Sequence, residues 1–434
     1  MSDWPTVSLA DVAEIRFSNV DKRDIPGEAR VRLCNYMDAY ANEYITADLP
    51  FMEASATQLE IERFRVSKGD VILTKDSETP DDIGIPAVVI DEISNLICGY
   101  HLALVKPNRD AIDSVYLAKQ LASKPTARYF ARLANGSTRY GLSSSAIAST
   151  SIPLAPLPQQ RSIAEILSTL DEMIEQTEAL IAKYQQIKAG LMHDLFTRGV
   201  TPDGGLCPTG ESQQTKFGRI PRGWRIGSLL EVADAARQPI LTGPFGADLG
   251  NDDFVAEGVP VLRIGNVQEG RLDLSDLLYV TEAKARDLQR YEVNEGDLLF
   301  ARQGATTGRN ALATPDVQGY LINYHIIRVA LDHSRCAPIF VEAAFNGEVV
   351  KRQVEREKGR GTREGINTAQ LKALELPLAP VPEQRTIAAI LMAHRALHAD
   401  MESQLAKLRQ LKHGLMHDLL TGCVRVEAVE STAG

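Results

Sequence analysis

Two histidine–aspartate pairs have side chains that catalysis could use. His193-Asp194 stands in the hexapeptide Gly-Leu-Met-His-Asp-Leu, and His417-Asp418 stands in a second copy of it. A histidine beside a carboxylate has the groups that general acid–base catalysis uses. Adjacent residues of a helix do not face each other, however, and leucines of a helical pattern flank both pairs. We therefore expect a structural or partner-contact role for them.

The motifs of enzyme chemistry are absent from the sequence. It has no Gly-x-x-x-x-Gly-Lys-Ser/Thr phosphate loop, no Gly-x-Gly-x-x-Gly after a strand, no His-Glu-x-x-His and no Asn/Asp-Pro-Pro-aromatic motif. The five cysteines lack the short spacing of a zinc or redox site. Asp276 with Glu282 and Lys284 has the residue types of a nuclease site, but a solvated helix start explains them better. We predict no catalytic residue, metal site or cofactor in this chain.

Basic residues gather with aromatic residues and glycines at matching places in the two halves. No acidic residue occurs between positions 124 and 140, and the stretch 359–365 is rich in glycine and arginine. The candidates for DNA contact here are Lys124, Arg128, Arg139, Tyr140, Arg360 and Arg363. Glycine lets a backbone approach a phosphate, and phosphate contacts position a protein on DNA without reading its sequence.

A second group of candidates follows a Gly-Asp strand in each half. Its members are Lys75 in the first half and Arg302, Gln303, Thr306 and Arg309 in the second. Arginine and glutamine bond bidentately to guanine and adenine edges. The first-half loop, 75–79, is more acidic. For any single residue a solvated charge explains its presence equally well, but the set at matching positions favours DNA contact.

Composition limits the class of protein. The 434 residues, 44% hydrophobic and 24% charged, are enough for several globular domains. The net charge of -10 argues against a protein coated in nucleic acid, yet local basic patches remain compatible with it, because phosphate contacts act over roughly 10 Å. The first residues do not read as a signal peptide, and the longest apolar runs are too short to cross a bilayer. We expect a cytoplasmic protein with no membrane partner.

The sequence is duplicated at a constant shift of 224 positions. Pro153-Leu-Ala-Pro-Leu-Pro-Gln-Gln-Arg161 matches Pro377-Leu-Ala-Pro-Val-Pro-Glu-Gln-Arg385, and the hexapeptide at 190–195 matches that at 414–419. Further upstream, Tyr100-His101 matches Tyr324-His325. The period is too long for a solenoid repeat, so these are duplicated domains.

Each copy has a mixed part, with short β-branched runs and late helical segments such as 115–121 and 340–354, followed by one long helix. The fold class predicted is α+β, with two duplicated mixed α/β domains, each followed by a long helix. The boundaries are 1–152 for the first domain, 153–199 for its helix, 200–221 for a surface linker, 222–376 for the second domain, 377–422 for its helix and 423–434 for a tail.

Both helices carry apolar residues at heptad spacing. The seam positions are Leu167, Ile174, Ile181, Leu191, Leu195, Leu391, Leu405, Leu408, Leu415 and Leu419. Lys188, His394, His398 and Lys412 interrupt the seam. A narrow seam on a rod of about 60 Å predicts packing on another helix, most simply the duplicate. Two amphipathic helices lying on globular cores explain the length and the 3.5-residue period less well.

With these features the chain resembles the DNA-specificity subunits of type I restriction–modification systems. The paired Pro-Leu-Pro-Gln-Gln-Arg and Pro-Val-Pro-Glu-Gln-Arg motifs, the paired hexapeptides and the Ile220-Pro-Arg-Gly-Trp224 opening carry the resemblance. It implies a non-catalytic subunit whose two target-recognition domains each read one half of a split target on double-stranded DNA. It also implies that the two long helices form an antiparallel coiled coil. It also implies two modification subunits that bind S-adenosylmethionine and methylate adenine, and restriction subunits that use ATP and Mg²⁺.

Two other classes stay open at this point. An interaction scaffold would bind protein only, and a gel shift on random DNA with the modification subunits would distinguish it by the absence of salt-sensitive binding. A fused restriction nuclease would cleave DNA with Mg²⁺ as a purified chain. The acidic balance slightly favours the scaffold, whereas the paired basic, glycine-rich loops favour DNA recognition.

Overall fold

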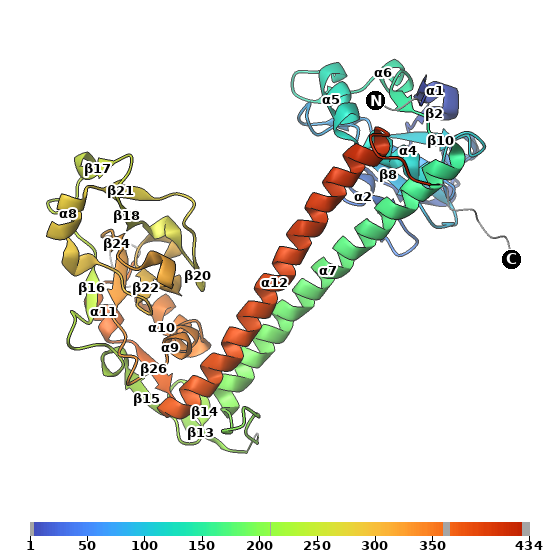
Figure 1. Cartoon of the computed structure of the whole chain (residues 1–434). Coiled ribbons are helices and arrows are strands. Elements are labelled where there is room, and N and C mark those ends of the chain that lie inside the picture. The colour runs from blue at the N-terminus through green and yellow to red at the C-terminus, as the bar shows by residue number, and fades with distance from the viewer. Residues whose placement is uncertain (1–3, 209, 359–364, 428–434) are drawn as a thin grey trace. The chain divides into compact units, whose positions relative to one another are not determined.

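The structure is a computed structural model that describes residues 4–208, 210–358 and 365–427. Its contacts divide it into two compact units (Figure 1). Unit 1 is Met1–Ala179 with Ser403–Gly434, and unit 2 is Leu180–Glu402. The long helices α7 (Leu157–Arg198) and α12 (Val381–Leu420) each contribute one part to either unit. The expected helix starts at Pro158 and Pro382 thus fall in the first turn.

Unit 1 is built on two main sheets. The larger has the order β2 (Ala13–Phe17), β10 (Leu102–Pro107), β6 (Val71–Thr74), β8 (Pro86–Val89), β4 (Tyr44–Ile45). The smaller has the order β5 (Met52–Ala56), β3 (Ala29–Cys34), β9 (Leu96–Cys98). Two strand pairs are β1 (Thr6–Ser8) with β12 (Ser151–Pro153) and β7 (Asp76–Ser77) with β11 (Tyr140–Gly141). The helices are α1 (Leu9–Val12), α2 (Tyr36–Tyr40), α3 (Gln58–Phe64), α4 (Ser114–Leu121), α5 (Lys124–Leu133) and α6 (Ser144–Ala148).

Unit 2 has two four-stranded sheets. The first has the order β16 (Ile240–Thr242), β25 (Ile326–Val329), β22 (Leu298–Ala301), β23 (Asn310–Leu312). The second has the order β17 (Phe254–Val255), β21 (Leu278–Val280), β18 (Val259–Leu262), β24 (Leu321–Ile322). The strand pairs are β13 (Ser212–Thr215) with β14 (Gly218–Pro221), β15 (Arg225–Ser228) with β26 (Glu375–Leu378) and β19 (Val267–Gln268) with β20 (Arg271–Leu272). The helices are α8 (Glu282–Asp287), α9 (Pro338–Phe345), α10 (Glu348–Lys358) and α11 (Thr368–Lys372).

Two expectations from the sequence are corrected here. The helix expected over 340–354 is two helices, α9 and α10, because the chain leaves the helix at Asn346-Gly347. The segment expected as a surface linker contains the hairpin of β13 and β14, in which Gly218 adopts a positive φ of 111° that favours glycine.

The repeated Gly-Asp motif forms the same turn in both units. Gly69 and Gly296 have φ values of +85° and +82°, which glycine adopts without the cost that a β-carbon brings. The Asp70 carboxylate accepts the backbone N–H of Ser67 at 2.9 Å, and that of Asp297 accepts the equivalent bond at 2.8 Å. The motif therefore starts the central strands β6 and β22.

A buried glutamine explains the repeated motif before each long helix. Gln160 Oε1 accepts the backbone N–H of Asp113 at 2.8 Å, just before α4. Gln384 Oε1 accepts that of Ala337 at 3.0 Å, just before α9. Both side chains also donate to the chain directly before their own helix, Gln160 to the carbonyl of Ala155 at 2.7 Å. Each glutamine thus holds its domain against the start of its helix.

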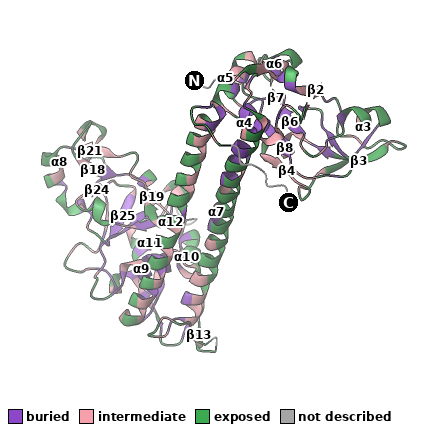
Figure 2. Cartoon of the chain, turned by 45° about the vertical axis from the view of Figure 1, so that its right-hand side comes forward, coloured by how far each residue is buried: buried purple, intermediate pink, exposed green. Residues whose placement is uncertain are grey.

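The heptad positions lie on the covered faces of α7 and α12. Leu167, Ile181, Leu195, Leu391 and Leu419 are buried. The other seam positions, Ile174, Leu191, Leu405, Leu408 and Leu415, are half-buried, and residues such as Glu175 and Ala406 between them are exposed. Among the described residues, burial is concentrated in the cores of the two units (Figure 2).

Residues of the two long helices contact each other inside each unit. In unit 1, Arg409 forms an ion pair with Glu178 at 2.6 Å. In unit 2, the rings of Tyr184 and His394 stack at 5.0 Å, and Gln185 Nε2 lies 3.4 Å from His398 Nε2. Two of the polar seam positions, His394 and His398, therefore have polar or aromatic neighbours on the other helix.

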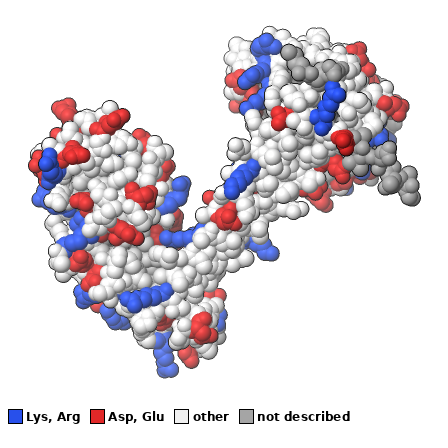
Figure 3. Space-filling model, viewed as in Figure 1, with Lys and Arg blue, Asp and Glu red and all other residues white. Residues whose placement is uncertain are grey.

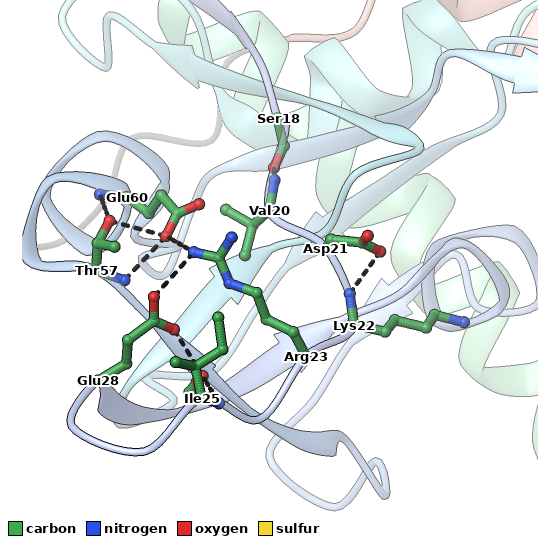
Figure 4. A network of polar contacts seen from close by, with 10 residues as sticks. Ser18, Val20, Asp21, Lys22, Arg23, Ile25, Glu28, Thr57 and Glu60 are labelled. Atoms are coloured by element: carbon green, nitrogen blue, oxygen red, sulfur yellow. Dashed lines mark hydrogen bonds and ion pairs between the residues drawn. The ribbon is translucent and has the colours of Figure 1, made fainter.

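A polar network fixes the smaller sheet of unit 1 (Figure 4). The Arg23 guanidinium donates to Glu60 at 2.6 Å and to Glu28 at 3.2 Å. Glu60 also accepts the backbone N–H of Thr57 at 2.9 Å, which completes the N-terminal cap of α3. Glu28 accepts the Ser55 hydroxyl of β5 at 2.6 Å. The network therefore joins the loop before β3 to β5 and α3.

Candidate nucleic-acid interface

In unit 1, the residues after β6 meet the chain that follows α5. The Lys75 backbone N–H donates to the carbonyl of His101 at 3.1 Å, and the Lys75 carbonyl accepts the N–H of Leu142 at 2.9 Å. Gly141 pairs with Asp76 between β11 and β7. The His101 ring nitrogen Nδ1 lies 2.8 Å from the Asp76 carboxylate. Lys75 and Tyr140, two of the sequence candidates, thus belong to one small constellation.

In unit 2, the residues after β22 make the same contacts. The Arg302 backbone N–H donates to the carbonyl of His325 at 3.0 Å, and the Arg302 carbonyl accepts the N–H of Ile366 at 2.8 Å. Gly365 forms a β-bridge with Gln303. The His325 ring nitrogen Nδ1 lies 3.1 Å from Gln303 Oε1. Glycine is needed here because a β-carbon on Gly365 would lie 2.8 Å from the Arg302 carbonyl oxygen.

The two constellations occupy equivalent sequence positions. Lys75 and Arg302 both lie five residues after the aspartate of the Gly-Asp motif, and the histidines and glycines are each 224 positions apart. The backbone bonds are the same, whereas the side chains differ: Lys75 and Asp76 in unit 1, Arg302 and Gln303 in unit 2. One backbone frame is thus repeated in the two units, and the polar side chains that it carries differ.

The basic side chains of these constellations are partly buried. Burial lowers the pKa of Lys75, and the nearby Asp76 opposes that effect. The Lys75 ammonium donates to the Ser18 carbonyl at 2.9 Å and lies 4.9 Å from the centre of the Tyr100 ring. The Arg302 guanidinium donates to the carbonyls of Ile366 and Tyr324, both at 3.3 Å. Those two bonds use two of the five N–H donors of arginine.

The environment of His325 disfavours the protonated ring. Burial lowers the pKa of His325, and the positive charge of Arg302 lowers it further. A neutral imidazole donates from one nitrogen and accepts at the other. If Nδ1 donates to Gln303 Oε1, the amide of Gln303 is held with its NH₂ group turned away from the histidine.

Exposed aromatic side chains border both constellations, and the sequence analysis did not single them out as site residues. Tyr100 and Tyr324 are 48% and 39% exposed. The Tyr324 ring lies 3.8 Å from the His325 ring, tilted by 37°, and 6.1 Å from the ring of Phe245, which is 59% exposed. The signal that could have found them is the repeated Tyr-His dipeptide. Such rings offer flat apolar faces next to the polar groups.

Two of the remaining second-half candidates hold the loop together. Thr306 Oγ1 donates to the Gln303 carbonyl at 3.3 Å. Arg309 is exposed and donates to Gln268 Oε1 at 2.9 Å. Arg309 is therefore fixed next to β19, and Thr306 acts on the conformation of Gln303.

The basic helices α5 and α10 differ in how their charges are placed. On α5, Lys124 and Arg128 are exposed, and Arg139 beyond its end is exposed as well. On α10, Arg352 pairs with Glu348 at 3.1 Å, and Lys351 pairs with Glu269 at 2.8 Å. These ion pairs leave α10 less cationic than its sequence alone indicates. Arg360 and Arg363 lie outside the described residues.

Two of the residues with catalytic appearance, His193 and Lys284, lie on helices of unit 2. His193 is exposed on α7, beside a cavity of about 1150 Å³ in unit 2 that Asp194, Lys188 and Arg395 also line. Lys284 in α8 pairs with Asp253 at 2.9 Å, which fits the helix-start interpretation. Within residues 4–208, 210–358 and 365–427, no group of His, Cys, Asp and Glu side chains is arranged to hold a metal ion.

Acidic and basic side chains are interspersed over the face of each unit that Figure 3 shows. No large surface of a single charge dominates that view, in keeping with the net charge of -10. None of the helices in the described part of the chain is both long and apolar enough to span a membrane.

Both halves of the chain are similar in sequence to one kind of domain. A family model described as the type I restriction modification DNA specificity domain matches residues 1–186 and 221–410. The chain is 22% identical over 428 residues to the type I restriction enzyme MjaVIII specificity subunit of Methanocaldococcus jannaschii, covering 98% of this chain and 94% of the relative. It is 21% identical over 395 residues to the EcoKI specificity subunit of Escherichia coli, covering 88% and 79%.

A solved structure shares the fold. The type I restriction–modification S subunit from M. genitalium matches with a TM-score of 0.58 and covers 96% of both chains at 14% identity.

Proposed function

The chain belongs to the family of type I restriction–modification DNA specificity subunits, and on that premise we propose how its two units recognise DNA. The role is non-catalytic recognition of a DNA sequence by two target-recognition domains. The constellation at Lys75 and Asp76 reads one part of a bipartite target, and the one at Arg302 and Gln303 reads the other. The domain boundaries of this proposal are those expected from the sequence, 1–152 and 222–376.

The observation that carries the proposal is the repetition of one backbone frame with different polar side chains. In both units the residue after the basic one faces a histidine ring, at 2.8 Å for Asp76 and 3.1 Å for Gln303. A carboxylate accepts from the cytosine amino group, whereas an oriented amide bonds to adenine at two atoms. Arg302 matches guanine in the same way. The two domains therefore read different half-sequences with equivalent residues.

Contacts outside the constellations position the protein on DNA and do not read its sequence. Lys124, Arg128 and Arg139, exposed in unit 1, neutralise phosphates. Tyr140, Thr306 and Arg309 support the reading loops. Arg360 and Arg363 are proposed phosphate contacts of the second domain from the sequence alone.

The long helices are proposed to pair as an antiparallel coiled coil. The contacts of Asp171 with Lys412 and of Glu178 with Arg409, both in unit 1, support this, because the residue numbers run in opposite directions along the two helices. Burial at the seam positions Leu167, Leu195 and Leu391 agrees with it.

A second apolar stripe on α7 is the proposed docking face for a modification subunit. Ile166, Met173, Leu180 and Ile187 recur every seven residues and are 37–52% exposed. Single exposed apolar residues are ordinary, but a heptad series on one helix is a surface for another helix. We expect two modification subunits, with S-adenosylmethionine, and restriction subunits, with ATP and Mg²⁺, to complete the complex.

The test is a map of methylated adenines in a host that produces the chain with its modification subunits. Arg302→Ala should change the second part of the target only, since losing a bidentate pair costs about 1–3 kcal/mol of base discrimination. Arg286→Ala, at an exposed arginine of α8, is the matched control and should leave the map unchanged. An Arg302→Ala map identical to that of the parent would refute the assignment of Arg302.

A further inference from the structure

A buried lysine joins the domain of unit 1 to both long helices. The Lys119 side chain, from α4, is 1% exposed and forms ion pairs with Glu43 and with Asp171 of α7. Lys412 of α12 pairs with the same two carboxylates, at 2.8 and 2.5 Å. Tyr44 adds a hydrogen bond from its hydroxyl to Asp171 at 2.6 Å. The domain thus meets α7 with a buried positive charge.

The corresponding junction of unit 2 has the opposite charge on the domain. The Glu342 side chain, from α9, is 1% exposed and forms an ion pair with Arg395 of α12. The positive charge of Lys188, on α7, also acts on Glu342. The domain here meets the helices with a buried negative charge.

The two junctions lie at equivalent positions of the repeat. Asp171 and Arg395 are 224 positions apart, and so are Lys188 and Lys412. The helices α4 and α9 have the same shift at both of their ends, and Lys119 and Glu342 occupy neighbouring positions within them. At the equivalent helix position unit 1 has the acidic Asp171 and unit 2 has the basic Arg395. The charge that the domain brings to it is reversed as well, basic in unit 1 and acidic in unit 2.

We propose that these reversed charges match each recognition domain to its own long helix and mismatch it to the other. On the second helix, Lys119 would meet Arg395 and Lys188, with only Glu43 to offset them. On the first helix, Glu342 would meet Asp171, with only Lys412 to offset it. An unpaired or like-charged group in a buried site costs far more than an exposed one. The junctions thus act as a placement device for the domains, which is separate from the reading of DNA.

Two cross-substitutions in the full chain test this directly. Asp171→Arg gives the first helix the residue of the second, and Arg395→Asp does the reverse. Unfolding of each unit is followed by the fluorescence of its own tryptophan, Trp4 in unit 1 and Trp224 in unit 2, in a chain where the other tryptophan is phenylalanine. The controls Asp171→Asn and Arg395→Gln remove the charge without reversing it.

Each reversal should lower the unfolding midpoint of its own unit by at least about 5 °C, more than its neutral control, and leave the other unit unchanged. Reversing the domain charge as well, with Lys119→Glu or Glu342→Lys respectively, should restore at least half of the loss. If Asp171→Arg does not fold, folding of the Lys119→Glu/Asp171→Arg double variant supports the proposal. Reversals no worse than neutral controls, or second changes without recovery, would overturn it. These readouts use no DNA, so they stand apart from the test of target recognition.

Discussion

In unit 1 the side chain beside the histidine ring is the carboxylate of Asp76, and in unit 2 it is the amide of Gln303. The residue before each of them makes the same two backbone bonds. Lys75 donates its N–H to the carbonyl of His101 and accepts the N–H of Leu142, and Arg302 donates to the carbonyl of His325 and accepts the N–H of Ile366. The backbone arrangement and the side-chain chemistry can therefore vary independently of each other. A substitution at one of these positions should change recognition in one unit without affecting the other unit.

The largest effect should come from charge placed on the seam. Leu195→Asp and Leu419→Asp are equivalent changes, at residues that are 0% and 2% exposed. Each should destabilise the unit whose core it enters, unit 2 and unit 1 respectively, by about 3–5 kcal/mol, because a buried leucine is replaced by an unpaired charge. Denaturant unfolding, followed by Trp224 and Trp4, measures it. If either change lowered the unfolding free energy of both units equally, the two units would not unfold independently.

A smaller effect is expected from the basic helices. Arg128 on α5 is exposed, whereas Arg352 on α10 pairs with Glu348. Arg128→Ala should weaken DNA binding by the assembled complex roughly threefold to tenfold for every sequence and reduce the salt dependence by about one charge. Arg352→Ala should do less. Binding measured over a range of salt concentrations decides this, and a change in sequence preference with Arg128→Ala would contradict a phosphate role.

The smallest effects concern pH, and they should have opposite signs in the two units. Burial raises the pKa of Glu342 despite the attraction of Arg395 and Lys188. A raised folded-state pKa adds stability that is present below the ordinary value of 4.5 and lost as pH rises through the folded pKa. As the pH falls toward 4.5, the parent should therefore gain stability in unit 2 relative to Glu342→Gln.

Asp171 should behave in the other direction. Burial raises its pKa, but Lys119 and Lys412, with the Tyr44 hydroxyl, outweigh burial and hold it below 3.8. A lowered pKa adds stability that is present above the ordinary value and lost as pH falls. Relative to Asp171→Asn, unit 1 of the parent should lose stability between pH 5 and 3.5. Urea midpoints at each pH give both signs, and the same sign in both units would be inconsistent with these environments.

The repetition of the sequence made much of this architecture predictable. The long helices begin and end within a few residues of the expected positions, because proline and glycine mark their ends and the heptad pattern marks their covered face. The break between α9 and α10 was missed, since apolar residues at helical spacing continue through Asn346-Gly347. The hairpin after α7 was missed because its composition is that of a linker.

The candidate site was predictable only in part. Lys75, Arg302 and Gln303 are candidates because of their place after the Gly-Asp strand, and the structure puts each beside the repeated histidine. The contact of Gln303 with His325 depends on the pairing of β22 with β25, which brings together residues that are 22 positions apart. No local pattern reports such a contact. The pairing of Arg309 with Gln268, 41 positions away, was hidden for the same reason.

The most direct test exchanges the chemistry inside one frame. Gln303→Glu and Asp76→Asn each interconvert an amide and a carboxylate while keeping nearly the same shape. Each variant is produced with the modification subunits, and methylated adenines are mapped across the host genome. Gln303→Glu should alter the second part of the target and leave the first part unchanged, and Asp76→Asn should do the reverse. Unchanged maps for both variants, or changes in both parts from either one, would contradict recognition by two separable constellations.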